Sequence, residues 1–339
     1  MTIKVSFIIP THNAAKFIVE TLESIQNQQV EPNIELEISI HDDGSTDETF
    51  QLCEAFLKTK WLRGSFALTK SENSQGAGRA RNLAVAQSTG RFLCFQDADD
   101  VSFPRRVQTQ LNICLEEDSD EILVGTKFIR DPPDATHHYA SFLNKLSQDD
   151  LYLKSFRELT LIQPTWFLPR VFFERLGGYH EGILAEDLEL FERILDIPNV
   201  RLRTSVEPLV VYRHLSGSSS SRTSRLELVH IRVKAFERRV LSQESWNQFS
   251  IWGAGRDGRA FFESLSHENR VKVQAFYDVD EKKIKASFHF KGLVLPIHYF
   301  RDIHPPFVVC VALGRTNGEL ERNVTSFGLI EGKDYWYFN

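Results

Sequence analysis

The stretch RFLCFQDADD, residues 91–100, is the most informative part of this chain. Its apolar first half is typical of a short buried strand, and two carboxylates spaced two residues apart follow it. Such a strand would place Asp97 and Asp99 together at its C-terminal end, where open α/β sheets bind their ligands. Oxygen ligands there suit a Mg²⁺ or Mn²⁺ ion that also holds a diphosphate. The same spacing recurs at 118–120 and 278–280, to which we assign no metal, so the surrounding sequence must decide.

The segments around this stretch alternate between strand-like and helix-like patterns. Residues 5–9 and 34–40 are buried-strand runs, and between them apolar residues recur at helical spacing. Ser45 and Glu48 form a capping-box pattern that predicts the start of the next helix. Residues 76–82 open a third helix, and the strand before Asp97 follows. The alternation predicts an α/β fold with a parallel, doubly wound sheet.

Five motifs in this part of the chain resemble those of glycosyltransferase family two, which has a GT-A fold. The resemblance covers about residues 3–215 and keeps the order and spacing of the motifs. It implies a metal-dependent enzyme that transfers a sugar from a nucleotide sugar with inversion at the anomeric carbon. The motifs are PTHN at 10–13, DDGSTD at 42–47, GAGRARN at 76–82, DADD with a later proline at 97–104, and GGY with EDLE at 177–189.

The resemblance assigns the nucleotide end of the donor to the first two motifs. Asp43 occupies the position at which the family reads the N3–H of uracil, and a carboxylate, which only accepts hydrogen bonds, suits that donor. Pro10, Thr11 and Asn13 would contact the base and ribose. The alternative for Asp43 is a purely structural turn aspartate, because Asp-Gly-Ser is rich in turns by itself.

The resemblance also implies a divalent metal site for Mn²⁺ or Mg²⁺. Asp99 matches the metal ligand, and Asp97 matches a carboxylate that meets the ribose, or the metal through water. His214 would complete the metal site or meet the diphosphate, and its alternative is a partly exposed loop histidine. Arg81 would either contact the donor or pair with a carboxylate near the strand ends.

Asp187 is the candidate general base. It follows Gly177-Gly178-Tyr179 and a loop, and it lies at the start of a predicted helix. A hydroxyl that attacks the anomeric carbon must lose its proton, and one carboxylate within hydrogen-bond reach suffices for that task. The alternative is that Glu186 and Asp187 only cap and solvate the helix.

Length and composition predict two domains and a cytoplasmic protein. The 339 residues exceed one ordinary core, no apolar run has membrane-spanning length, and the N-terminus enters a strand without a signal-like segment. The four cysteines show no paired spacing and suggest reduced thiols. We expect a GT-A domain at 1–215, a basic loop and amphipathic linker helix at 216–247, and a Rossmann-like domain at 248–339.

The linker is unusually basic. Residues 201–240 contain nine Lys or Arg against three Glu, a net charge of +6 in a protein of net charge −6. Arg225, Arg232 and Arg239 fall along one flank of the expected helix. They could form a solvated face, which is the commoner meaning of such a run, or a surface that contacts phosphates of a nucleic acid.

The last block begins with a strand-like run, 249–252, and the glycine pattern Gly253-x-Gly255-x-x-Gly258, followed by Asp278. Only half of a dinucleotide-binding fold is recognisable. A degenerate half-Rossmann-like module used for packing or partner contact is favoured over a nucleotide site.

This tail, together with the transferase part, resembles the queuosine-tRNA galactosyltransferases. The resemblance implies UDP-galactose as donor, queuosine at the wobble position of tyrosine tRNA as acceptor and β-galactosyl-queuosine as product. Two alternatives stay open: a UDP-N-acetylglucosamine-dependent transferase acting on a glycan or protein, and a nucleotide-binding oxidoreductase or sensor built on the C-terminal glycine loop. No membrane partner is expected.

Overall fold

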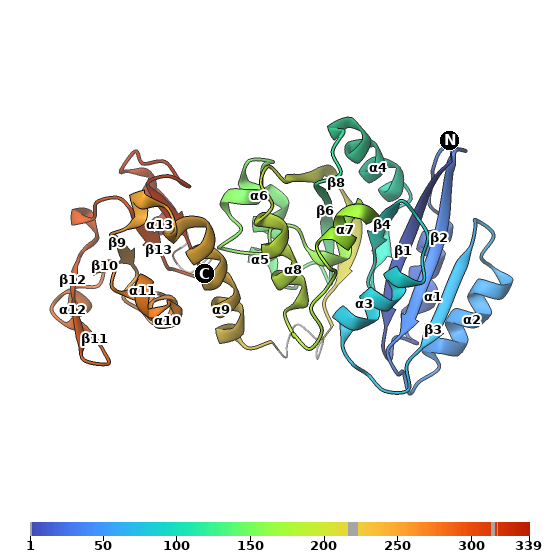
Figure 1. Ribbon diagram of the computed structural model, residues 1–339, viewed down its shortest axis with the longest axis horizontal. Helices are drawn as coiled ribbons and strands as arrows, with labels where there is room; N and C mark the ends of the chain where they lie inside the picture. The colour runs from blue at the N-terminus through green and yellow to red at the C-terminus, as the bar shows by residue number, and fades with distance from the viewer. Residues whose placement is uncertain (1, 216–222, 313–315, 317) are drawn as a thin grey trace. The chain divides into compact units, whose positions relative to one another are not determined.

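The computed structural model describes residues 2–215, 223–312, 316 and 318–339, and these form two compact units (Figure 1). Unit 1 comprises Met1–Leu151 and Leu161–Thr223, and unit 2 comprises Tyr152–Thr160 and Ser224–Asn339. The basic loop expected at 216–222 lies outside the described residues. Within the described part of the chain, no helix combines the length and apolar character needed to cross a bilayer.

Unit 1 is built on one mixed sheet with the strand order β3-β2-β1-β4-β7-β6-β8-β5. Strands β3, β2, β1 and β4 are parallel, as the alternating sequence pattern predicts, whereas β7 runs antiparallel to β4 and to β6. The strands are β1 (Ile3–Thr11), β2 (Ile34–Asp42), β3 (Phe66–Lys70), β4 (Phe92–Phe95), β5 (Val101–Ser102), β6 (Ile122–Asp131), β7 (Phe167–Pro169) and β8 (Arg201–Arg213).

Helices cover this sheet because their apolar faces match those of the strands. Val5, Phe7 and Ile9 of β1 are fully buried and belong to one core with Ile18 and Leu22 of the first helix. The helices of unit 1 are α1 (Ile18–Gln26), α2 (Thr49–Thr59), α3 (Ala77–Ala86), α4 (Arg106–Glu117), α5 (His137–Lys145), α6 (Asp150–Leu153), α7 (Arg170–Arg175) and α8 (Glu186–Leu195). The last residues of α6 already belong to unit 2.

The expected capping box was wrong. Helix α2 begins at Thr49, and neither Ser45 nor Glu48 caps it. Asp47 accepts the Thr49 amide at 3.0 Å instead, while the Ser45 hydroxyl accepts the amide of Asn13 at 2.9 Å. The turn after β2 is therefore used to hold the turn after β1.

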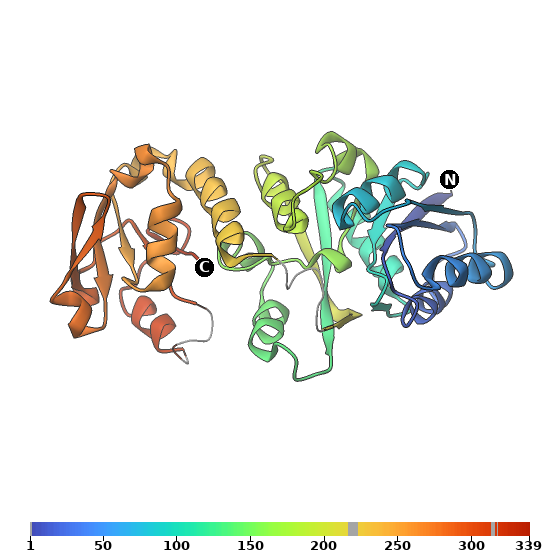
Figure 2. The same cartoon turned by 90° about the horizontal axis from the view of Figure 1, so that it is seen from below.

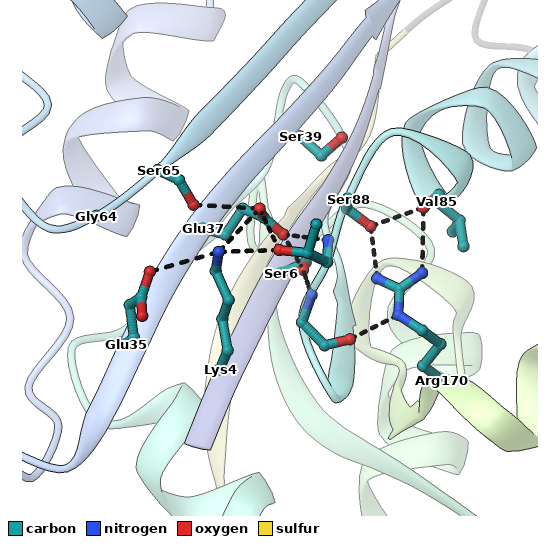
Figure 3. Close-up of polar contacts among 12 residues, drawn as sticks. Lys4, Ser6, Glu35, Glu37, Ser39, Gly64, Ser65, Val85, Ser88 and Arg170 are labelled. Atoms are coloured by element: carbon teal, nitrogen blue, oxygen red, sulfur yellow. Dashed lines mark hydrogen bonds and ion pairs between the residues drawn. The ribbon is translucent and has the colours of Figure 1, made fainter. Parts of the chain in front are cut away.

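A buried polar cluster ties the strands together, and Figure 3 shows its contacts. The carboxylate of Glu37 in β2, which is 4% exposed, accepts hydrogen bonds from Ser6 at 2.5 Å, from Ser65 at 3.1 Å and from the Thr89 amide at 2.7 Å. Burial alone would raise the pKa of Glu37, but these bonds and the charge of Lys4 lower it to about 2. The cluster therefore joins β1, β2 and the segments before β3 and β4.

Unit 2 contains a second sheet with the order β11-β12-β10-β9-β13-β14, parallel except for β11. The sheet continues past β9 on both sides, so it is more complete than the half-fold expected from the sequence. Its strands are β9 (Phe249–Trp252), β10 (Val273–Asp278), β11 (Ser287–Phe290), β12 (Leu293–Tyr299), β13 (Phe307–Val309) and β14 (Tyr335–Tyr337). Its helices are α9 (Arg225–Phe236), α10 (Arg256–Ser264), α11 (His267–Arg270), α12 (Glu281–Ile284) and α13 (Glu319–Thr325).

Helix α9, expected to be a linker, packs into the core of unit 2 beside α10 (Figures 1 and 2). Arg225 pairs with Asp257 at 2.7 Å, buried Arg232 donates to the Asn339 carbonyl at 2.8 Å, and Arg239 lies over the Phe156 ring at 4.5 Å. The three arginines thus have contacts within unit 2, while the Arg225 side chain stays 38% exposed, and the phosphate-contacting surface remains a prediction. Phe156 comes from residues 152–160, the part of unit 2 that precedes the last section of unit 1 in the chain.

Candidate functional site

The candidate site lies at the C-terminal ends of the parallel strands of unit 1. Strands β1 and β2 pair in register up to Thr11 and Asp42, and the Asp43 amide donates to the Thr11 carbonyl at 2.7 Å. Because parallel strands end at the same edge, the motifs at 10–13, 42–47 and 97–100 converge there. The sequence predicted this convergence from the order of strands alone.

Asp43 organises the loop that leads into α3. Its carboxylate is 4% exposed and accepts hydrogen bonds from the Ser74 hydroxyl at 2.7 Å, the Gln75 amide at 2.9 Å and the Gly76 amide at 2.9 Å. A carboxylate has about four acceptor positions, so these three donors leave room for one more. Asp43 therefore does hold this turn, and that role is compatible with a uracil N–H as a fourth hydrogen-bond donor.

The residues expected around the base and ribose are held beside Asp43. Asn13 adopts a left-handed conformation (φ 50°), and its side-chain oxygen accepts the Thr46 amide at 2.9 Å. Thr11 is 2% exposed, and Pro10 pairs with His41 of β2. These contacts place Pro10, Thr11 and Asn13 together, while their role in donor binding remains a prediction.

Three carboxylates gather after β4. One oxygen each of Asp97, Asp99 and Asp100 can lie within 4.8 Å of the others. Burial, with the nearby charge of Asp97, raises the pKa of Asp99 to about 6, and burial with the charges of Asp99 and Asp97 raises the pKa of Asp100 well above its ordinary value. One buried and two partly buried acids this close together are costly without a cation.

The chemistry of this cluster fits a divalent metal. Oδ1 of Asp100 accepts the Arg213 amide at 2.9 Å, but buried Oδ2 has no hydrogen-bond partner within the described residues. An orphaned carboxylate oxygen beside two further carboxylates is the donor set that Mg²⁺ or Mn²⁺ prefers. Asp100 was not predicted, although its place in the DADD motif was the available signal.

Arg81 pairs with carboxylates, one of the two roles left open for it. Its guanidinium donates to Asp97 at 2.8 Å and to Glu186 at 2.6 Å, and the side chain is 7% exposed. Burial opposes the charge of Arg81, but the neighbouring carboxylates more than compensate and raise its pKa. Arg81 thus lies between the carboxylate cluster and the first residue of α8.

Asp187, the candidate base, is the second residue of α8. Its Oδ1 accepts the Leu188 amide at 2.7 Å, and burial raises its pKa above the ordinary value. A raised pKa makes a carboxylate a stronger base, provided that it is ionised at the working pH. Glu186 precedes Asp187 in the chain and pairs with Arg81, which also pairs with Asp97. The sequence did not reveal the contact between Glu186 and Arg81.

His214 is exposed and lies outside the carboxylate cluster formed by the described residues. Its Nδ1 faces Arg130 at 3.2 Å, and its amide donates to the Asp131 carbonyl at 2.8 Å. An arginine only donates, so Nδ1 accepts this bond and Nε2 is left for other partners. The metal or diphosphate role of His214 remains a prediction.

The glycine loop of unit 2 is packed against its own sheet. A Cβ on Gly258 would lie 1.9 Å from the Gly253 carbonyl oxygen, and Gly253 has φ +117°. Asp278, which would meet a ribose in a dinucleotide site, accepts the Ala254 amide at 2.9 Å and the Lys283 amine at 2.9 Å. Close packing of the third glycine also occurs in dinucleotide-binding loops, so the packing role expected for this module remains a prediction.

Comparison with known proteins connects unit 1 to transferases. Residues 6–177, half of the chain, match the model of "Glycosyl transferase family 2". The chain is 36% identical over 124 residues to the poly(ribitol-phosphate) β-N-acetylglucosaminyltransferase TarS of Staphylococcus aureus, covering 37% of this chain and 21% of that protein. It is 27% identical over 135 residues to the glycosyltransferase GlyG of Streptococcus pneumoniae, covering 40% and 42%. The matched part is thus less than half of either relative.

Solved structures share the fold. TarS residues 1–349 of S. aureus, in complex with UDP-GlcNAc, superpose with a TM-score of 0.51 at 18% identity, covering 78% of this chain and 71% of that one. The mannosyltransferase PcManGT of Pyrobaculum calidifontis, in complex with GDP-Man and Mn²⁺, gives 0.54 at 20% identity, covering 72% and 66%. The GT-A fold expected from the sequence is confirmed.

Proposed function

This chain belongs to glycosyl transferase family 2, and from that premise we propose that it is an inverting, metal-dependent glycosyltransferase that uses a UDP-sugar. One observation carries the proposal: Arg81 pairs at once with Asp97 of the carboxylate cluster and with Glu186, the neighbour of Asp187. A donor held by the cluster would therefore have a candidate base nearby on the acceptor side.

In the proposed reaction Asp187 takes the proton of the acceptor hydroxyl as that oxygen attacks the anomeric carbon. The bond from this carbon to the diphosphate oxygen breaks, and its electron pair leaves with UDP, so a single displacement inverts the configuration. Asp43 would bind the uracil N3–H, with Pro10, Thr11 and Asn13 around the base and ribose. A divalent cation held by Asp97, Asp99 and Asp100 would supply Lewis-acid stabilisation of the leaving diphosphate.

For the finer specificity we propose transfer of galactose from UDP-galactose to the queuosine of tyrosine tRNA, giving β-galactosyl-queuosine. The sequence resemblance of the tail supports this acceptor, and a wobble base in a single-stranded loop is accessible without opening a duplex. Arg225, Arg232 and Arg239 already have contacts within unit 2, so we expect further groups of the chain to help hold the tRNA. We place the reaction in the cytoplasm, because all four cysteines are free thiols.

A second candidate is a UDP-N-acetylglucosamine-dependent transferase that acts on a glycan or protein. The observation that favours it is the relative TarS, whose name specifies N-acetylglucosamine transfer and whose fold was determined with UDP-GlcNAc. An oxidoreductase or sensor is disfavoured by the contacts of Asp278, and absence of NADH binding in a titration would remove it.

One experiment separates these candidates. The purified chain is incubated with Mn²⁺ and either UDP-galactose or UDP-N-acetylglucosamine, together with queuosine-containing tRNA, and the digested nucleosides are analysed by mass spectrometry. A hexosyl-queuosine formed only with UDP-galactose supports the first proposal. Matched controls are tRNA that lacks queuosine and the Asp187→Asn variant. Hydrolysis or transfer only from UDP-N-acetylglucosamine would favour the second candidate, and failure to bind UDP with Mn²⁺ would overturn both.

A further inference from the structure

The GAGRARN segment, residues 76–82, looks like a phosphate-binding loop, but its contacts point elsewhere. Helix α3 begins at Ala77, and three of its positions, Gly78, Arg81 and Asn82, make close contacts with the chain between Gly178 and Asp187. A fourth position, Arg79, reaches Glu181 of the same stretch through a more exposed ion pair. That stretch carries the candidate base. Each of the three positions makes a different kind of contact, and all lie within unit 1.

Gly78 allows close approach. A Cβ built on it would lie 3.2 Å from Cγ of Glu186 and 3.3 Å from Cβ of Tyr179. Glycine within a helix costs about 1 kcal/mol relative to alanine, and Gly78 does not have a positive φ that would require it. The close approach of Glu186 and Tyr179 is therefore the physical reason for glycine at this position.

Asn82 holds the loop before α8 through its backbone. Its side-chain nitrogen donates to the Tyr179 carbonyl at 2.8 Å, and its side-chain oxygen accepts the Tyr179 amide at 2.9 Å. Gly178 also packs closely against Asn82, because a Cβ on Gly178 would lie 2.7 Å from the side-chain oxygen of Asn82. Two reciprocal bonds fix both the position and the direction of the loop.

Arg81 completes the contact with charge. Its two terminal nitrogens reach Glu186 at 2.6 Å and Asp97 at 2.8 Å, and the guanidinium lies 5.6 Å from the Tyr179 ring centre. The planar fork of an arginine holds two carboxylates in fixed directions, which lysine cannot reproduce. The Arg81 side chain is 7% exposed, so little of its guanidinium is accessible to a diphosphate.

We propose that Gly78, Arg81, Asn82 and Glu186 form a positioning clamp that fixes the base Asp187 relative to the metal-binding carboxylates, rather than a donor-binding loop. This inference rests on the proposed function, since it assigns its role through Asp187. The clamp links the donor side at Asp97 to the acceptor side at α8. Because a displacement of about 1 Å at a reacting group can cost about a hundredfold in rate, the effect belongs in kcat.

The test uses two variants that keep the fold. Glu186→Gln preserves size but removes the charge that holds Arg81, and Gly78→Ala favours the helix while pushing Glu186 and Tyr179 away. We expect each to lower kcat about tenfold or more, with UDP affinity at saturating Mn²⁺ and the KM for the UDP-sugar within about twofold of wild type. The matched control is Arg79→Gln on the same helix: Arg79 contacts the same stretch through Glu181, but both side chains of this pair are exposed, by 36% and 50%, so its loss should leave kcat unchanged.

A second measurement does not depend on activity. Hydrogen exchange of the amides at 182–190 should accelerate in both variants and not in Arg79→Gln, because the clamp limits opening of this segment. Unchanged exchange with wild-type kcat would overturn the inference. A loss of UDP affinity with unchanged kcat would overturn it too, by making the segment a donor contact. Failure of the wild-type chain to bind UDP would instead refute the proposed function, while the exchange result would still decide whether the clamp exists.

Discussion

The backbone amide of Arg213 donates to Oδ1 of Asp100 at 2.9 Å, while Oδ2 of the same buried carboxylate has no hydrogen-bond partner in the described part of the chain. Strand β8 therefore fixes Asp100 on one side and leaves the other side for a further ligand. With Asp97 and Asp99 nearby, the mutual repulsion of the three carboxylates is costly. Binding sites often lower the stability of the protein in this way.

The Asp100→Asn variant should be more stable than wild type without metal. Removing one charge from three neighbouring carboxylates should raise the free energy of unfolding at pH 8 by about 1–2 kcal/mol. Mn²⁺ should then raise the Tm of wild type clearly and that of the variant little, as followed by thermal denaturation. An equal Mn²⁺ shift in both proteins would contradict a role for Asp100 at the metal.

Metal binding should depend on pH through Asp99. The pKa of its carboxyl is raised to about 6, so the protonated form prevails below pH 6 and the metal-binding carboxylate forms above it. Mn²⁺ affinity, measured by calorimetry, should fall about tenfold between pH 7 and pH 5. The Asp99→Asn variant should show no metal-dependent UDP binding at any pH. Retention of that binding would exclude Asp99 as a metal ligand.

The Asp187→Asn variant should bind UDP with Mn²⁺ normally and fail to transfer sugar. Loss of a general base costs typically 10²–10⁴-fold in rate, and asparagine preserves the shape of the side chain. Single-turnover assays with UDP-sugar would measure this loss. Glu181→Gln, an exposed change in the preceding loop, serves as control, and turnover of Asp187→Asn near that of wild type would refute the assignment.

Glu37 should make stability depend on pH at the acid end. Its pKa is lowered from 4.5 to about 2, so its contribution is fully present above pH 4.5 and disappears as pH falls towards 2. The free energies of unfolding of wild type and Glu37→Gln, measured with denaturant, should differ by about 3 kcal/mol at pH 7 and by less at pH 3. Glu35→Gln, at a side chain that is 42% exposed, should be neutral within about 0.5 kcal/mol. A difference that is the same at both pH values would contradict the shift.

The sequence predicted the parallel half of the sheet and its carboxyl-end motifs because both follow from local periodicity. Asp43, Asp97 and Asp99 are placed by strands whose ends are legible in the chain. The partners of Arg81 were not legible, since Glu186 lies 105 positions away and no local pattern records that pairing. The capping box failed because Asp47 accepts the Thr49 amide, while the Ser45 hydroxyl is engaged by the Asn13 amide.

The arginines of α9 show why charge runs mislead. Their spacing along one helix flank was correct, but partners far away in sequence, Glu158, Asp257 and Asn339 among them, occupy that flank. A charge pattern predicts on which face of a helix a residue lies, but it does not predict which other segments pack against that face. Burial therefore had to come from the structure.

Residues 152–160 belong to unit 2 although the chain on both sides of them belongs to unit 1. Phe156 packs its ring against Phe236 and Trp336, and Arg157 reaches Glu321 at 2.6 Å. The chain consequently passes between the units three times instead of once. Cutting the chain after Thr223 would leave Phe156 in the first fragment, separated from the rings of Phe236 and Trp336 in the second. The two units therefore have to be expressed and engineered as one chain.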